Sequence, residues 1–292
     1  MKLSISTNIM NADLGKIYQV PMSLSVKACA AAGYQYLDAN LSRMCRMDQA
    51  LTRDGWELWV SKIRELADNL GIMFIQAHAY WTMGNLIQED KIRHGDMQEE
   101  ELMKRCVLAA EKLGVRWMVV HPYTVSGERG CDFKKSFLFN REYYKRWGEF
   151  YASHHVGMAI ENLFSHKETV RYGCSAEELL ELTDAIDNPA VRICIDTGHA
   201  HLSGFDPAVM IRKIGNHLKA AHIADNHQNK DEHFAPFNGT INWMEVMRAF
   251  KDIGYEEAFA FEIHNLTSMY PAAVQQHLID FSFSLGEFLM NL

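Results

Sequence analysis

Short apolar segments recur along the chain and alternate with stretches of helical periodicity. Eight segments are rich in β-branched and aromatic residues, as buried strands are: residues 3–7, 34–39, 72–77, 116–120, 157–160, 191–195, 219–223 and 258–263. They begin roughly 25 to 45 residues apart, and amphipathic stretches such as 56–70, 99–113, 176–186 and 272–289 lie between them. This alternation predicts an α/β protein in which eight strands and eight helices follow one another.

Two folds fit that alternation, a closed (β/α)8 barrel, the TIM barrel, and an open doubly wound sheet. The number and spacing of the strands favour the barrel. Helix-to-strand junctions are short and carry Gly or Asn, whereas the strand-to-helix segments 80–95, 123–140, 163–174 and 226–241 are long. In a TIM barrel these long segments form the active face. No linker or composition break interrupts the chain, so residues 1–292 are predicted to form a single domain.

Apolar residues at helical spacing predict which helix faces lie against the barrel. They are Leu58, Ile63, Leu66 and Leu70 in one helix and Leu278, Phe281, Leu285 and Phe288 in the last one. Aromatic residues of the long segments could stack on a sugar or pack the loops together; they are Tyr80, Trp81, Tyr123, Phe133, Phe137, Phe139, Phe164 and Trp243.

Residues that can bind a metal ion end four consecutive predicted strands. They are Glu161, Asp196, His222 and Glu262. Unpaired carboxylates at the rim of an apolar barrel are costly to desolvate, so three of them with an imidazole suggest a shared cation. Three oxygen donors and one nitrogen suit Mn²⁺, Mg²⁺, Co²⁺ or Zn²⁺. We expect a divalent metal ion to bind at this end of the barrel.

A second, nitrogen-rich set of side chains lies on the same predicted face. It comprises His78, His121, His199, Asp231 and His233. Such groups could bind further metal ions, or contact a polyol substrate and relay protons. Pairing of the strand-end histidines with neighbouring carboxylates is the purely structural alternative.

The charge balance argues against general binding of polyanions. Lys and Arg total 29 against 37 Asp and Glu, a formal charge of −8, although bound divalent ions would cancel part of it locally. The six cysteines form no C-x-x-C motif, so we expect reduced thiols. The chain has no run of about 18 apolar residues, the length that crosses a membrane, and no apolar core of a signal peptide. We therefore expect a cytoplasmic protein without a membrane partner.

The residues around the four strand ends carry a resemblance. Ile195-Asp196-Thr197-Gly198-His199-Ala200, with Ile160-Glu161-Asn162 before it and His222-Ile223-Ala224-Asp225-Asn226 and Phe261-Glu262 after it, resembles the xylose-isomerase-like TIM barrel superfamily. That superfamily includes sugar epimerases and isomerases, inosose-processing enzymes and abasic-site nucleases of the endonuclease IV type.

For a sugar isomerase or epimerase, the resemblance implies that Glu161, Asp196, His222 and Glu262 hold the divalent metal. Glu161 and Glu262 would serve as base and acid on opposite faces of a small sugar, sugar phosphate or cyclitol, through an enediolate that the metal stabilises. His199 would contact a substrate oxygen. Two positions depart from the ketose 3-epimerase pattern, because Lys167 and Gln228 stand where an acid and an arginine are expected; Glu168 could replace the acid.

The resemblance also leaves other activities open. All nine metal ligands of an endonuclease IV site have counterparts here, namely the four strand-end residues and the nitrogen-rich set. Against a nuclease, the second strand-to-helix segment offers only Arg43, Arg46 and Arg53 for a DNA backbone. The element 236–243 resembles one found in sugar-acting members. A lyase acting on an oxidised sugar or an inosose, and a binding protein without activity, are further alternatives. We favour the carbohydrate enzyme, with nucleic acid not expected as a partner and a homo-oligomer consistent with the fold.

Overall fold

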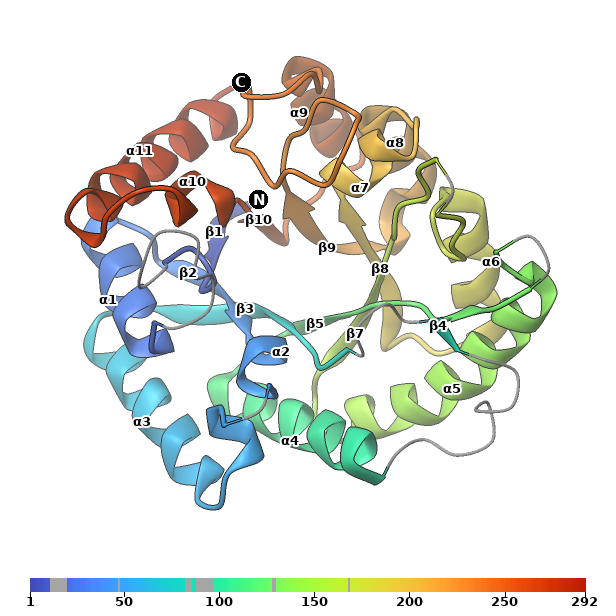
Figure 1. The fold of residues 1–292 in the computed structure, drawn as a ribbon, viewed down its shortest axis with the longest axis horizontal. Helices are drawn as coiled ribbons and strands as arrows, with labels where there is room; N and C mark the ends of the chain where they lie inside the picture. Colours follow the sequence, from blue (N-terminus) through green and yellow to red (C-terminus); the bar gives the residue numbers. More distant parts are fainter. Residues whose placement is uncertain (11–19, 47, 82–85, 88–96, 128–129, 168) are drawn as a thin grey trace.

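The computed structural model describes residues 1–10, 20–46, 48–81, 86–87, 97–127, 130–167 and 169–292. Parallel strands close into a barrel whose neighbours follow chain order, and the last strand pairs with the first (Figure 1). The strands are β1 (Lys2–Ser6), β2 (Tyr36–Asn40), β3 (Met73–His78), β5 (Trp117–Val120), β7 (Gly157–Glu161), β8 (Val191–Asp196), β9 (Leu218–Ile223) and β10 (Ala258–Phe261). The predicted barrel is thus confirmed, and the open sheet is wrong.

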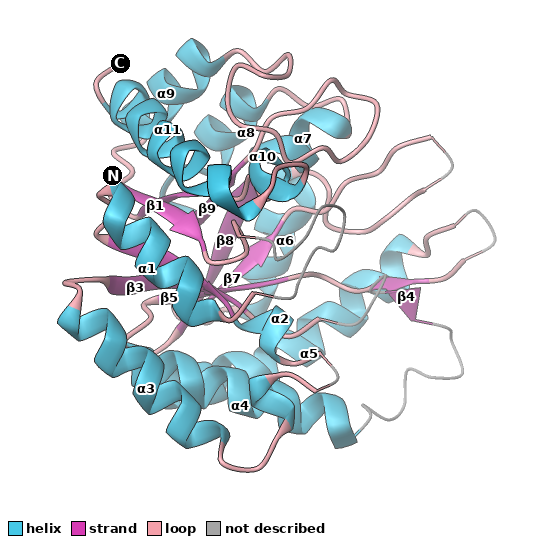
Figure 2. Cartoon of the chain, turned by 60° about the vertical axis from the view of Figure 1, so that its left-hand side comes forward, coloured by secondary structure: helices cyan, strands magenta, loops and turns pink. Residues whose placement is uncertain are grey.

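Helices surround the barrel in the order of the chain (Figure 1). They are α1 (Met22–Ala32), α3 (Trp56–Asn69), α4 (Met97–Leu113), α5 (Phe133–Ser153), α6 (Ala176–Ile186), α8 (Pro207–Ile214), α9 (Trp243–Asp252) and α11 (Ala272–Met290), with the short α2 (Leu41–Met44), α7 (Thr197–Leu202) and α10 (Asn265–Ser268) at strand ends and the 3-10 turns η1 (Ala50–Thr52) and η3 (Gly215–His217). Two further strands, β4 (Leu86–Ile87) and β6 (Thr124–Val125), pair away from the barrel, as Figure 2 shows for β4. Within the described ranges no helix is long and apolar enough to cross a membrane.

Helix α5 begins inside a segment that we predicted to be a loop. The Asp132 side chain accepts a hydrogen bond from the backbone N–H of Lys135 at 3.0 Å, which caps the helix just before Phe133. Phe133, Phe137 and Phe139 are therefore helical residues and not loop residues.

The inside of the barrel shows why the strand-end residues converge. Val119, Ala159, Cys194 and Ala220 form a small buried cluster, separate from the main apolar core, on β5, β7, β8 and β9. Side chains two residues apart in a strand point to the same face. Residues 121, 161, 196 and 222 each lie two positions after a member of this cluster, so they point into the barrel directly above it.

Two of the predicted helix faces are partly wrong. Leu58 and Leu70 of the α3 region and Phe281 and Phe288 of α11 are exposed. The buried residues of α11 are Gln275, Ile279, Ser282, Gly286 and Leu289, and a Cβ on Gly286 would lie within 2.4 Å of the Leu3 side chain in β1. Close approach of helix and strand therefore selects a small residue for the inner face and leaves the two phenylalanines outside.

Candidate functional site

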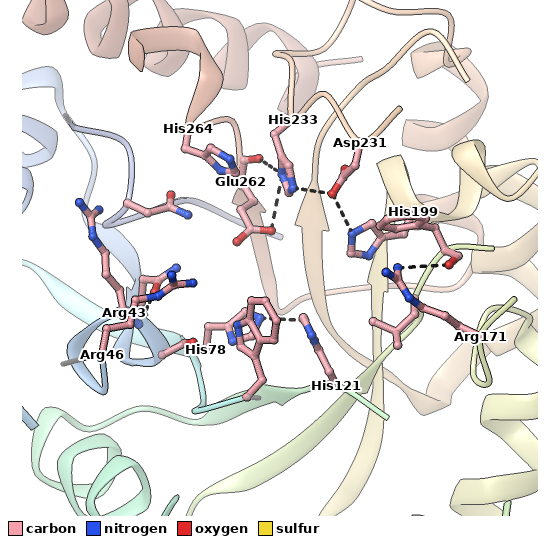
Figure 3. A pocket seen from close by; sticks show the side chains of 16 residues that line it. Arg43, Arg46, His78, His121, Arg171, His199, Asp231, His233, Glu262 and His264 are labelled. Atoms are coloured by element: carbon pink, nitrogen blue, oxygen red, sulfur yellow. Dashed lines mark hydrogen bonds and ion pairs between the residues drawn. The ribbon is translucent and has the colours of Figure 1, made fainter. Parts of the chain in front are cut away.

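A pocket of about 430 Å³ lies at the carboxyl ends of the strands (Figure 3). Its volume is within the usual range for small-molecule sites. Six of the nine residues singled out in the sequence line it: His78, His121, His199, Asp231, His233 and Glu262. The other three, Glu161, Asp196 and His222, are buried beneath it. All nine therefore meet at one end of the barrel.

The four strand-end residues form one compact group. Glu161, Asp196, His222 and Glu262 each offer a ligand atom, and these atoms all lie within 4.8 Å of one another. The Nδ1 atom of His222 is 2.6 Å from Glu161 Oε1 and 3.6 Å from Glu262 Oε2. Within the described residues, the buried Asp196 Oδ2 accepts no hydrogen bond. A buried carboxylate oxygen without a donor is costly, and a bound cation would remove that cost. These residues thus fit a divalent metal ion.

The acids of this group differ in their proton affinity. Burial raises the pKa of Asp196 to about 6, and the charge of Glu161 adds to this, although His199 opposes it. Burial alone would also raise the pKa of Glu161, but the charges of His222 and His121 outweigh it and hold this pKa well below the usual range. Glu161 is therefore ionised in the folded protein at neutral pH.

Two more compact donor groups flank the first. His78 and His121 form one of them together with Glu161. His121 Nε2 is 2.7 Å from Glu161 Oε2 and 3.0 Å from His78 Nε2. Glu161 is thus shared between this group and the strand-end group.

The other flanking group consists of His199, Asp231 and His233. Asp231 Oδ2 is 3.5 Å from Nε2 of His199 and 3.2 Å from Nε2 of His233. The Nδ1 atoms of the two histidines lie 2.9 and 2.8 Å from the backbone carbonyls of Asn162 and Glu262. An N–H donated to each carbonyl leaves Nε2 directed at Asp231, the arrangement common for histidines that bind metal ions.

A buried acid that we did not single out in the sequence supports His222 from behind. Asp38 Oδ2 of β2 is 2.9 Å from His222 Nε2 and accepts a hydrogen bond from Gln76 Nε2 at 2.7 Å. Neither Asp38 nor Gln76 is exposed. An acid in the middle of an apolar predicted strand was the signal that could have revealed it.

The loop after β9, which carries Asp231 and His233, is held by Asp225. Its Oδ2 accepts hydrogen bonds from Trp243 Nε1 at 2.8 Å and from the backbone N–H of Phe237 at 3.0 Å. The element 236–243 therefore has a structural role, since it anchors this loop to α9. Trp243 is buried there and does not line the pocket.

The positions that depart from the ketose 3-epimerase pattern lie away from the pocket. Lys167 is exposed, and Gln228 donates a hydrogen bond to the backbone carbonyl of His201 at 2.9 Å. Glu168 lies outside the described residues.

Aromatic and basic side chains complete the pocket wall. Of the aromatic residues singled out, Trp81 and Phe164 line it, whereas Tyr123 packs against Phe139 and Tyr143. Arg43, Arg46 and Arg171 also line it. Arg171 was not recognised in the sequence, because its segment contains no pattern that distinguishes it from other loop arginines.

Comparison with known proteins places the chain in a family. Residues 26–283 match the xylose isomerase-like TIM barrel family. Among curated relatives, D-psicose 3-epimerase of Enterocloster bolteae is 25% identical over 69% of this chain and 65% of its own length. An uncharacterized protein of Methanocaldococcus jannaschii is 28% identical over 57% of each chain. The alignments with these relatives thus span less than two thirds of the relatives' length.

Solved structures show the same fold. A D-psicose 3-epimerase from Clostridium cellulolyticum H10 with D-tagatose superimposes with a TM-score of 0.73 at 14% identity over 99% of both chains. A 3-keto-D-glucoside 4-epimerase from E. coli gives 0.69 at 12% identity, over 97% of this chain and 99% of the other. Because the family match covers most of the sequence, the chain belongs to the xylose isomerase-like TIM barrel family.

Proposed function

We propose that this protein is a divalent-metal-dependent isomerase or epimerase of a small sugar, sugar phosphate or cyclitol. The observation that carries the proposal is the group of Glu161, Asp196, His222 and Glu262 at the floor of a pocket of about 430 Å³. The names of the relatives support it, since a D-psicose 3-epimerase is among the curated relatives and among the solved structures.

The four residues would hold the metal ion, and their donor set suits Mn²⁺, Mg²⁺, Co²⁺ or Zn²⁺. A divalent cation bound there supplies Lewis acidity, which makes a C–H bond next to a substrate carbonyl more acidic. Trp81 and Phe164 line the pocket above and would shield the reacting carbon from water.

Glu161 and Glu262 would move the proton. Burial would raise the pKa of Glu262, but the charges of His222 and His233 lower it below the usual value, so both acids begin ionised and able to act as bases. Abstraction of the proton by one carboxylate gives an enediolate. If the other carboxylate takes up a proton from water, it can return that proton from the opposite face and invert the carbon, whereas return of the abstracted proton to the neighbouring carbon along one face moves the carbonyl. Two carboxylates from β7 and the end of β10 suit the first outcome.

One observation favours a second candidate, a phosphodiesterase similar to endonuclease IV. The nine residues form three compact donor groups, two of which share Glu161, and several metal ions held close together suit cleavage of a phosphodiester. The formal charge of −8 opposes binding of a DNA backbone. We therefore keep the sugar enzyme as the proposed function.

The test combines metal analysis with an exchange assay. Metal-replete protein is incubated with a panel of ketoses in D₂O, and NMR follows deuterium entry at the carbon next to the carbonyl. We expect exchange, an epimeric or isomeric product and one divalent ion per chain. A dehydrated product would indicate a lyase. Incision of an abasic-site duplex at physiological salt, with two or three zinc ions per chain and no exchange, would overturn the proposal in favour of the nuclease.

A further inference from the structure

Arg171 presents a cation to the pocket from the segment between β7 and α6. Its guanidinium carbon lies 4.3 Å from the centre of the Phe164 ring, which itself packs 5.2 Å from the ring of His199. The backbone N–H of Arg171 donates to Ser165 Oγ at 2.9 Å. Both its backbone and its side-chain plane are therefore fixed before a ligand enters.

Arg171 lines the pocket, and among the described residues its guanidinium donates a single side-chain hydrogen bond. That hydrogen bond is long, from Nη1 to the backbone carbonyl of Phe164 at 3.4 Å. In the described part of the chain no carboxylate lies within 4 Å of its nitrogens. Asp231, the acid that also lines this side of the pocket, lies between His199 and His233. A planar group with five N–H donors and one weak bond is suited to bind an incoming anion.

The opposite wall of the pocket is also basic. Figure 3 shows Arg43 and Arg46 across the pocket from Arg171, beyond His78. Arg43 is 5% exposed and belongs to α2, whose four residues are all buried. Among the described residues, three guanidinium groups thus line the pocket beside two carboxylates, Asp231 and Glu262, both in candidate metal-binding groups. Cations in a confined pocket attract anionic ligands and raise their local concentration.

A neutral sugar can accept hydrogen bonds from a guanidinium with its oxygens, but it does not neutralise the charge. Hydroxyl groups can be bound by neutral side chains, whereas partial burial of a guanidinium carries a desolvation cost that an anionic partner would offset. Burial lowers the pKa of Arg171 in agreement with such a cost.

We propose that the substrate carries an anionic substituent, a phosphoryl or carboxylate group, and that Arg171 binds it. The inference rests on the proposed function for the sugar part of the ligand. It concerns how the substrate is bound and not how it reacts.

The test measures binding of three probes that share one carbon skeleton. D-Fructose is neutral, D-fructose 6-phosphate carries a phosphoryl group, and D-fructuronate carries a carboxylate at the same carbon. Calorimetric titration of the metal-loaded wild-type protein is expected to give at least one anionic probe that binds about 10- to 100-fold more tightly than fructose, the effect of a charged hydrogen bond. Whichever anionic probe binds more tightly identifies the group.

Arg171→Gln is expected to remove most of this preference while binding of fructose stays unchanged, and Arg171→Lys to retain part of it. Arg53→Gln is the matched control, because Arg53 is exposed and does not line the pocket. Circular dichroism verifies that each variant is folded, and the partial rescue by lysine separates loss of charge from loss of structure.

Equal affinity of the wild-type protein for all three probes, or binding of none, would overturn the inference. A preference that survives in Arg171→Gln would overturn the role of Arg171, since the anion would then be bound elsewhere. Proton exchange on neutral ketoses without a preference for anions would leave the proposed function standing and this inference refuted. A preference that depends on Arg171, without any proton exchange, would leave this inference standing and the proposed function refuted.

Discussion

His222 and Asp38 lie 2.9 Å apart inside the barrel, although 184 residues separate them in the chain. Strands β2 and β9 bring them together across the interior. The contact occupies Nε2 of His222 and leaves Nδ1 directed at Glu161, 2.6 Å away. Gln76 Nε2 donates a hydrogen bond to the same carboxylate oxygen of Asp38 and holds this acid in place. Asp38 therefore sets which nitrogen of His222 faces the candidate metal site.

Replacing Asp38 with Asn is expected to weaken metal affinity about 10- to 100-fold, because the partner that orients the imidazole and increases its basicity is lost. A competitive chelator titration measures the change, and Asp68→Asn, an exposed acid on α3, is the control. Unchanged affinity in a folded Asp38→Asn variant would show that His222 is oriented without this acid.

Glu161→Gln and Glu262→Gln are each expected to reduce turnover about 100- to 10,000-fold, since each removes a group that accepts or donates the substrate proton. The exchange assay in D₂O provides the measurement, and Glu149→Gln serves as control because Glu149 is exposed on α5. Either variant with near-wild-type turnover would refute the acid and base roles.

Metal stoichiometry distinguishes one ion from several. Asp196→Asn and His222→Ala are expected to lower the metal content of the purified protein, because both belong to the strand-end group. His121→Ala is expected to leave it unchanged if one ion is bound, whereas a protein with several ions would lose one. Elemental analysis after dialysis gives the count. Full metal content in Asp196→Asn would remove that residue from the ligands.

Asp225→Ala is expected to lower the free energy of unfolding by about 3 kcal/mol, because Trp243 Nε1 and buried backbone N–H groups lose their acceptor. Urea denaturation measures the change, and Asp54→Ala, at an exposed position, is expected to change stability by less than about 0.5 kcal/mol. If Asp225→Ala were as stable as the wild type, the loop after β9 would be held by other contacts.

The six cysteines are expected to react slowly with Ellman's reagent in the folded protein. All six are free and buried, and burial raises the pKa of Cys174 to about 12, so little thiolate is present at neutral pH. Six thiols should react at once in guanidinium chloride. A thiol that reacts rapidly without denaturant would reveal an opening of the barrel wall that the structure does not show.

Much of the fold could be predicted because the signals are local. Each buried strand carries its own run of β-branched and aromatic residues, and Gly or Asn marks the ends of several helices, so all eight barrel strands are recognisable without knowledge of their neighbours. The candidate metal-binding residues were recognisable for the same reason. A side chain that can bind a metal ion, such as that of Asp196, stands out when it directly follows an apolar run. The alternation of side chains along the strand then places it on the inner face of the barrel.

Contacts between distant segments decided the rest. The acid that orients His222, the guanidinium that stacks on Phe164 and the side of α11 that meets β1 all depend on which segments the closed barrel places together. The alternation of eight strands with helices, and the residues that end the strands, can be recognised from the sequence alone, because those properties follow from patterns of a few residues. Which of those residues share a cavity, and which charges face it, depends on the three-dimensional fold, because barrel closure brings together positions that are far apart along the chain.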